Sequence, residues 1–197
     1  MDKKHLAITL SKLEPIDLPI ASLEQYQTPG EIAAAILFIA LPDIQKRVVA
    51  DLGCGNGIFA IGAALLGAES VYGVDIDQAV IDTAKRNAKR VGAKVNFVCR
   101  DVREFYRNVD TIIQNPPFGV QEEHADKMFL QKACELSKVV YTIHKIESKM
   151  FIEKFSDDVG FKSKLIGTFD FPIKATMEHH RKPTHEVKVG LWKLTKS

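Results

Sequence analysis

The chain has 197 residues, of which 46% are apolar and 26% are charged, and its formal net charge is +2. We therefore expect one globular domain over residues 1–197 with a substantial core. No apolar run is long enough to span a bilayer, and the first residues lack the apolar core of a secretory signal. The three cysteines form no CxxC pair. These features exclude a membrane-spanning or disulfide-stabilised class and predict reduced thiols and a cytoplasmic localisation.

Apolar segments alternate with amphipathic segments along most of the chain. Residues 1–28 form an N-terminal arm, and we identify no motif between Leu6 and Leu23. Thr28 is a good helix N-cap, with Pro29 at the first helical position and Glu31 completing a capping box. The pattern predicts helices at residues 29–41, 58–66, 78–91, 125–137 and 148–157, and strands at 48–52, 70–74, 95–99, 109–114, 139–143, 164–169 and 186–194.

Strands that alternate with helices in this way indicate a doubly wound, Rossmann-like α/β fold. The last two strands lack a long helix between them, so we expect them to pair antiparallel. The predicted architecture is therefore a seven-stranded, mostly parallel sheet with one antiparallel strand, in a single domain. Residues 174–197 form a basic segment within it, with six Lys or Arg against two Glu. From charge alone, a solvated surface is the simpler interpretation of this segment, and contact with phosphate is the alternative.

The loop after the first strand reads Asp51-Leu52-Gly53-Cys54-Gly55-Asn56-Gly57. Glycines at this position let the backbone turn tightly and approach a bound molecule. The dinucleotide fingerprint G-x-G-x-x-G fails, because its last small residue would fall on Ile58. The spacing resembles motif I of class I methyltransferases that depend on S-adenosylmethionine.

Two further acids, Asp75 and Asp101, end the second and third strands. Asp75 is placed to accept hydrogen bonds from both ribose hydroxyls of such a cofactor. Asp101 is placed to accept from its adenine amine, with the Val102 N–H facing a ring nitrogen. Each acid alone is an ordinary strand-end residue, but three acids after three successive strands, beside a glycine loop, predict a cofactor site.

The fourth strand is followed by Asn115-Pro116-Pro117-Phe118. Neither proline has an N–H for a sheet, so the strand must stop there in a stiff, extended turn. The motif resembles motif IV of the amino-methyltransferases. The Asn115 side-chain oxygen and the Pro116 carbonyl can accept N–H bonds from an NH₂ group, and Phe118 can stack on a planar base. The turn therefore predicts catalysis by positioning, without a general base.

A closer resemblance rests on five motifs that occur in order, namely Glu24-Gln25-Tyr26-Gln27-Thr28, the glycine loop, Gly73-Val74-Asp75-Ile76-Asp77, Asn115-Pro116-Pro117-Phe118-Gly119 and His144-Lys145. Together they resemble the methyltransferase-like-five family, which makes N6-methyladenosine in small-subunit ribosomal RNA. The resemblance implies cofactor contacts at Gln25, Thr28, Gly53, Gly55, Asn56, Ile58, Asp75, Asp101 and Val102, beside Asp51.

The same resemblance implies two partners. Ribosomal RNA would meet the basic segment at Lys174, His179, Arg181 and Lys182. A small zinc-binding activator subunit would pair with the third strand, residues 95–99, which lies at the sheet edge in this fold and carries almost no charge. Burial of that strand under residues 102–106 is the alternative.

Two other functions fit parts of the sequence. A protein glutamine-N5 methyltransferase grips an amide NH₂ with the same turn, although such enzymes favour Tyr at the aromatic position and carry an added N-terminal domain. A non-catalytic RNA-binding scaffold would bind no cofactor. His144 either lines the substrate pocket or only ends the fifth strand. The histidines between positions 179 and 185 lack the companion ligands of a metal site.

Overall fold

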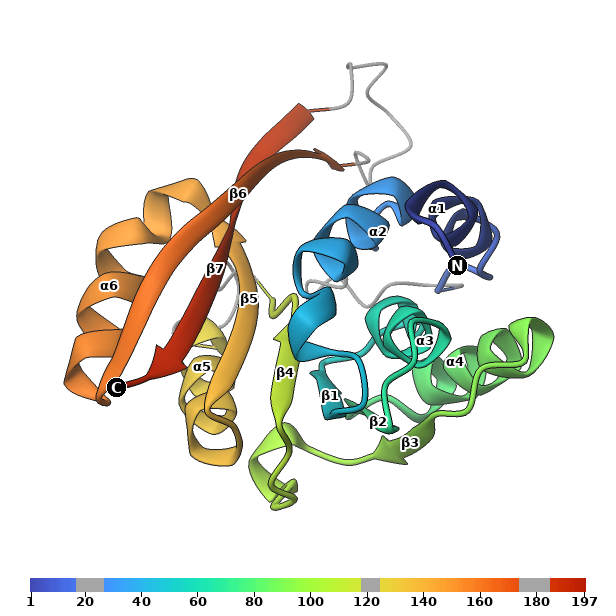
Figure 1. The fold of residues 1–197 in the computed structure, drawn as a ribbon, viewed down its shortest axis with the longest axis horizontal. Coiled ribbons are helices and arrows are strands. Elements are labelled where there is room, and N and C mark those ends of the chain that lie inside the picture. The colour runs from blue at the N-terminus through green and yellow to red at the C-terminus, as the bar shows by residue number, and fades with distance from the viewer. Residues whose placement is uncertain (17–26, 118–124, 174–184) are drawn as a thin grey trace.

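The chain folds around one seven-stranded sheet in a computed structural model, with the strand order β3-β2-β1-β4-β5-β7-β6 (Figure 1). The structure describes residues 1–16, 27–117, 125–173 and 185–197. The strands are β1 (Val48–Leu52), β2 (Ser70–Asp75), β3 (Asn96–Cys99), β4 (Thr111–Gln114), β5 (Val139–Lys145), β6 (Phe161–Ile173) and β7 (His185–Lys196). The helices are α1 (Lys3–Ser11), α2 (Gly30–Ile39), α3 (Ile58–Leu65), α4 (Gln78–Val91), α5 (Ala125–Leu136) and α6 (Lys149–Asp158), with short 3₁₀ turns η2 (Leu41–Asp43), η3 (Val102–Glu104) and η4 (Ile146–Ser148).

The sheet confirms the predicted topology. Strands β3, β2, β1, β4 and β5 pair in parallel, and β7 runs antiparallel to both of its neighbours, β5 and β6. β6 and β7 are longer than predicted, because they pair with each other from Phe161 opposite Lys196 to Ile173 opposite His185. In Figure 1 this pair extends past the other strands.

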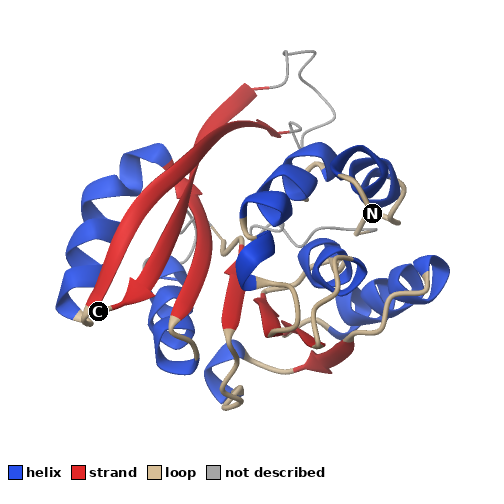
Figure 2. Cartoon of the chain, in the orientation of Figure 1, coloured by secondary structure: helices blue, strands red, loops and turns tan. Residues whose placement is uncertain are grey.

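Helices cover both faces of the sheet (Figure 2). One buried cluster lies between the sheet and α1, α2 and α3, and includes Leu6, Leu37 and Ile61. The other lies between the opposite face and α5 and α6, and includes Leu130, Ile152 and Trp192. Among the described residues, no helix combines the length and the apolar character needed to cross a membrane.

The N-terminal region differs from the prediction in two ways. Helix α1 forms where we expected an arm without a motif, and it begins at Asp2, whose side chain accepts a hydrogen bond from the His5 N–H. The predicted Thr28 cap is wrong. Helix α2 begins at Gly30 after Pro29, and no side chain caps it. The Thr28 hydroxyl is instead a hydrogen-bond partner of Asn115.

The close approach of α1 and α2 explains why α2 starts with a glycine. A Cβ atom at Gly30 would lie 2.3 Å from the Ser11 Oγ and 2.5 Å from the Ser11 backbone nitrogen. Any other residue would push the two helices apart at this point. The glycine at position 30 therefore allows the C-terminal end of α1 to pack directly against the start of α2.

Candidate active site

The carboxyl ends of β1, β2 and β4 lie side by side, and this brings the predicted site residues together. Leu52, the last residue of β1, is in register with Val74 of β2 and with Gln114 of β4. The glycine loop, Asp75 and Asn115 follow or adjoin these positions. Since ligands of open α/β sheets bind at the carboxyl edge, the three motifs share the expected location.

The glycine loop turns back over the end of β2. Gly53, Gly55 and Gly57 all have positive φ angles, of 70°, 54° and 87°, which only glycine adopts without strain. The N–H groups of Gly53 and Cys54 both donate to the Val74 carbonyl, at 2.8 and 2.9 Å. The loop is thus held by its backbone, and Gly53 and Gly55 have no side chains of their own that would exclude a ligand.

Asp75 is bound to this loop. Its Oδ2 accepts a hydrogen bond from the Gly55 N–H at 2.9 Å, and its Oδ1 accepts from the Asp77 N–H at 3.2 Å. Burial raises the pKa of Asp75 above its usual value, although these hydrogen bonds oppose the rise. A carboxylate has about four lone-pair sites, so Asp75 keeps acceptor capacity for hydroxyl groups.

Asp51 is almost completely buried, with 1% of its surface exposed. Its Oδ2 accepts from the Ala60 N–H at 3.0 Å in the first turn of α3, while its Oδ1 has no hydrogen-bond partner in the part of the chain that the structure describes. Burial raises the pKa of Asp51 to about 8, and repulsion from Asp75 contributes to the rise. A buried unpartnered oxygen costs stability, so it marks a place where a ligand donor can bind.

Asp101 lies two residues after β3 and has a partner of its own. It caps η3 by accepting from the Arg103 N–H at 2.8 Å, and it pairs with the Arg103 guanidinium. The Arg103 hydrogen bonds lower the pKa of Asp101. Val102 is buried. The expected adenine contacts of Asp101 and Val102 stay predictions.

Two apolar side chains, Ile76 next to Asp75 and Phe129 beside the loop, were missed from the sequence. Ile76 directly follows Asp75 and is 56% exposed, which is high for an isoleucine at the end of a buried strand. Phe129 of α5 lies against the glycine loop, with its Cε1 3.0 Å from the position of a Cβ at Gly53. An apolar residue just after a strand-end acid was the available signal for Ile76. No sequence pattern connected Phe129 to residue 53.

The Asn115 side chain has a fixed orientation that leaves its oxygen available to accept a hydrogen bond. Its Nδ2 donates to the Thr28 Oγ1 at 3.2 Å, which fixes the orientation of the amide. Its Oδ1 is buried and has no hydrogen-bond partner among the described residues. Pro116 is buried beside it. Gln25, Phe118, Lys174, His179, Arg181 and Lys182 lie outside the described residues.

Asn56 and Ile58 do not present their side chains as ligand contacts. The Asn56 Nδ2 donates to the Glu14 carbonyl at 3.1 Å, and Ile58 packs in the core beneath α3. Their predicted roles therefore rest on backbone groups alone.

Three buried polar side chains from β4 and β5 form a hydrogen-bonded row. The Gln114 Nε2 donates to the Thr142 Oγ1 at 3.2 Å, and Thr142 lies 2.8 Å from the His144 Nε2. Burial lowers the pKa of His144 to about 3, so the imidazole is neutral when it hydrogen-bonds to the Thr142 hydroxyl. β5 continues to Lys145, so His144 does not end the strand. His144 contacts Thr142 within β5, and Thr142 links β5 to Gln114, the residue that precedes Asn115.

The methyltransferase small domain family matches residues 29–140, which is more than half of the chain. The rRNA N(6)-adenosine-methyltransferase METTL5 of Danio rerio is 32% identical over 99% of this chain and 99% of its own. The chain belongs to the METTL5-like family of methyltransferases. A crystal structure from Pyrococcus horikoshii, described as a proposed RNA methyltransferase, is 43% identical with a TM-score of 0.91, covering 100% of this chain and 98% of that one.

More distant matches show how far the family fold extends. Magnesium protoporphyrin IX methyltransferase from Synechocystis, solved with bound S-adenosylmethionine, has a TM-score of 0.66 at 17% identity, over 100% of this chain and 98% of that one, and shows the same fold. The release factor glutamine methyltransferase of Bacillus anthracis is 40% identical, but over only 40% of this chain and 30% of its own. The full-length similarity is thus to the METTL5-like family.

Proposed function

We propose that the protein transfers a methyl group from S-adenosylmethionine to the N6 amine of an adenosine in ribosomal RNA, which the family resemblance assigns to the small subunit. The observation that carries this proposal is the unpartnered, buried Oδ1 of Asn115, held by Thr28 beside the glycine loop. An amine N–H is the donor that such an oxygen lacks. A ribosomal substrate also agrees with the predicted cytoplasmic localisation.

The residues at the carboxyl edge fit the cofactor. The glycine loop has no side chain at Gly53 or Gly55, Asp75 has acceptor capacity for the ribose hydroxyls, and the buried Asp51 Oδ1 can accept from the ammonium group. Ile76 offers an exposed apolar surface for the adenine ring, and the Asp101 carboxylate and the Val102 N–H are its expected polar contacts. When bound, S-adenosylmethionine supplies an electrophilic methyl group on a sulfonium centre.

Asn115 and Pro116 orient the acceptor. The lone pair of an adenine amine is delocalised into the ring, so the nitrogen is a weak nucleophile. Two hydrogen bonds, to the Asn115 Oδ1 and the Pro116 carbonyl, hold the amine with its lone pair toward the methyl group. Asn115 cannot take a proton near neutral pH, so the amine loses its proton after the transfer. Phe118 stacks on the base, which must leave its helical stack to reach the turn.

The basic segment supplies the RNA contacts in this proposal. Lys174, His179, Arg181 and Lys182 bind phosphates, which gives affinity that falls with salt concentration and carries little sequence information.

The test is to incubate the protein with labelled S-adenosylmethionine and ribosomal RNA, with and without a zinc-binding activator, and then to digest the RNA to nucleosides. We expect label in N6-methyladenosine. Its absence under both conditions would refute the proposal. Label in protein would instead favour a glutamine methyltransferase. That alternative is supported only by the partial match to the release factor glutamine methyltransferase.

We further propose that the activator subunit pairs with β3. This strand is the sheet edge, and Asn96 and Cys99 are exposed. The Arg100 N–H donates to the Asp75 carbonyl of β2 at 2.8 Å. Because backbone groups alternate along a strand, the N–H groups of Phe97 and Cys99 face away from β2, where a partner strand can accept them.

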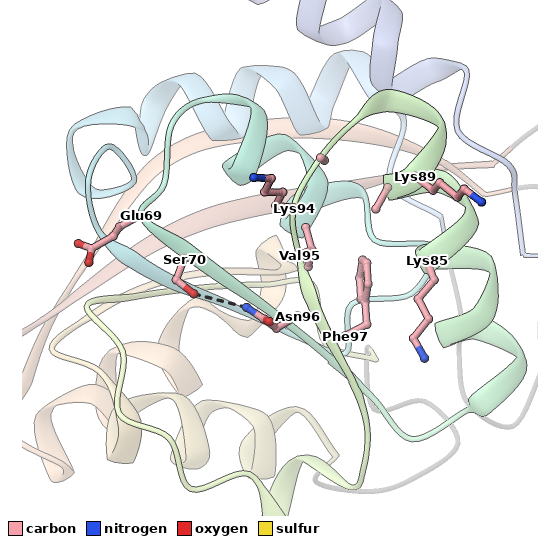
Figure 3. A pocket seen from close by; sticks show the side chains of 10 residues that line it. Glu69, Ser70, Lys85, Lys89, Lys94, Val95, Asn96 and Phe97 are labelled. Atoms are coloured by element: carbon pink, nitrogen blue, oxygen red, sulfur yellow. Dashed lines mark hydrogen bonds between the residues drawn. The ribbon is translucent and has the colours of Figure 1, made fainter.

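The surface next to β3 suggests the charge of that partner. Lys85 and Lys89 of α4, with Lys94, line a pocket of about 470 Å³ alongside the strand (Figure 3). Glu69 is the one acidic residue that lines it. A partner that adds a strand here is therefore expected to carry carboxylates next to that strand.

A proline at position 99 tests the pairing. Cys99→Pro removes an N–H that points outward and leaves the Arg100 bond to β2 in place. We expect it to abolish co-purification with the activator, while Cys99→Ser, which keeps the N–H, binds normally. Equal binding by the two variants would exclude strand addition at this edge.

A further inference from the structure

Two buried asparagines hold the backbone of one residue of the N-terminal region. The Asn87 Oδ1 accepts from the Glu14 N–H at 2.7 Å, and the Asn87 Nδ2 donates to the Glu14 carbonyl at 3.0 Å. The Asn56 Nδ2 donates to the same carbonyl at 3.1 Å. Asn87 and Asn56 are 1% and 2% exposed. Both main-chain groups of Glu14 are thus satisfied by side chains that are inaccessible to water.

These asparagines come from two different elements, of which one is the glycine loop. Asn56 is in the glycine loop and Asn87 is on α4, and they are joined to each other because the Asn87 Nδ2 also donates to the Asn56 carbonyl at 3.1 Å. The clamp formed by Asn56, Asn87 and the Glu14 backbone therefore ties the loop, α4 and the N-terminal region at one point. In Figure 1 this region joins α1 to the part of the molecule that contains α3 and α4.

The charged contacts around the clamp are more exposed. The Glu14 carboxylate pairs with Arg86, at 2.9 Å to Nη2 and 3.2 Å to Nε, but these side chains are 34% and 54% exposed. Exposed ion pairs contribute little, whereas hydrogen bonds to buried groups are costly to lose. The position of the N-terminal region is therefore set by the asparagines and not by the side chain of Glu14.

The clamp places Ile16 in front of the glycine loop. The Ile16 Cδ1 lies 3.7 Å from the position that a Cβ would have at Gly55. Ile16 is only half-buried, and it belongs to neither buried cluster of the described residues. An apolar side chain that faces a bare glycine backbone, and that contributes to no core, has the position expected for the wall of a ligand site.

We propose that Ile16 is a cofactor-binding residue and that Asn56 and Asn87 position it by holding the Glu14 backbone. The inference rests on the proposed use of S-adenosylmethionine. Under this proposal the Asn56 side chain positions a cofactor-binding residue, in addition to any contact that the Asn56 backbone makes with the cofactor.

Calorimetric titration of the full-length protein with S-adenosylmethionine tests this assignment. We expect Ile16→Ala to raise the Kd for S-adenosylmethionine about tenfold, which corresponds to about 1.4 kcal/mol, without changing Tm in the absence of cofactor. Asn87→Ala should raise Kd at least as much. Glu14→Ala should stay within about twofold of wild type, because the clamp holds the backbone of that residue.

The matched control is Ile8→Ala, since Ile8 is an exposed isoleucine on α1. It should bind like wild type. Wild-type Kd in Ile16→Ala, or tighter binding, would overturn the role of Ile16 even if Asn87→Ala proved unstable. Absence of binding by the wild-type protein would instead refute the proposed cofactor, so the two failures are distinguishable.

Discussion

The replacement Asn115→Ala separates the two halves of the candidate active site. The change removes the unpartnered Oδ1 and the Nδ2 that donates to Thr28 at 3.2 Å. It leaves the glycine loop and Asp75 intact. If Asn115 faces the acceptor base, turnover should fall while the affinity for S-adenosylmethionine stays nearly unchanged.

The expected loss in kcat is about 10²–10³, the effect of deleting one preorganised polar group that interacts with the reacting atoms. The cost to folding is smaller. A hydrogen bond such as that from Asn115 to Thr28 contributes about 0.5–1.5 kcal/mol, and each kcal/mol shifts Tm by about 2–4 °C for a chain of this size. Loss of the unpartnered oxygen offsets part of that cost.

The assay combines methyl transfer to ribosomal RNA, calorimetry with S-adenosylmethionine, and thermal unfolding. Asn108→Ala is the matched control, because Asn108 is an exposed asparagine near the opposite end of β4. It should leave all three measurements unchanged. Activity of Asn115→Ala within about fivefold of wild type, or a loss of cofactor affinity above about tenfold, would show that Asn115 does not orient the acceptor.

Three further predictions concern the cofactor edge and the buried polar row. Asp75→Ala should raise the Kd for S-adenosylmethionine by at least about tenfold, because hydrogen bonds to charged groups contribute about 1.5–3 kcal/mol; unchanged affinity in calorimetry would remove Asp75 from the site. Thr142→Val breaks the hydrogen bonds to Gln114 and His144 and leaves the buried Gln114 amide unpaired, so it should lower the free energy of unfolding by about 1–3 kcal/mol. Thr142→Ser keeps the hydroxyl and should not. Equal Tm values for the two variants would contradict this role of Thr142. The pKa of Asp51 in the folded protein, about 8, lies above its ordinary value of 3.8, so folding takes up a proton and stability falls as pH rises toward 8. Asp51→Asn removes this dependence, and its Tm relative to wild type should increase between about pH 5 and pH 8 and then level off; a constant difference would show that the carboxyl is ionised throughout.

Most of the sheet was predictable from local sequence. Parallel strands that are buried on both faces consist of short apolar runs. The turns between them contain glycine, aspartate or proline, because these residues favour the backbone conformations of turns. The strand ends therefore identified the glycine loop, Asp75 and Asn115, and the alternation of elements predicted that these would meet at one edge. The helix α1 was missed because only two of its residues, Leu6 and Leu10, are fully buried.

The contacts that orient the site depend on residues far apart in the chain. Thr28 has the sequence context of a helix cap, but its hydroxyl is a partner of Asn115, 87 positions away. Asn87 reads as a polar position on an amphipathic helix, yet it is 1% exposed and holds Glu14. No local pattern predicts such pairs, because they exist only when α1, α2 and α4 have packed around the loop.

Glycines, strand-end acids and an Asn-Pro-Pro-Phe turn constrain the backbone wherever they occur, so local sequence was enough to predict a cofactor site at the carboxyl edge. The tertiary structure decided which polar atoms are already paired. It showed that Asp101 is engaged by Arg103 and Asn56 by the Glu14 backbone, whereas the Asn115 Oδ1 is left without a partner. Each polar atom has a limited capacity for hydrogen bonds, so only packing reveals which acceptors remain available to a ligand.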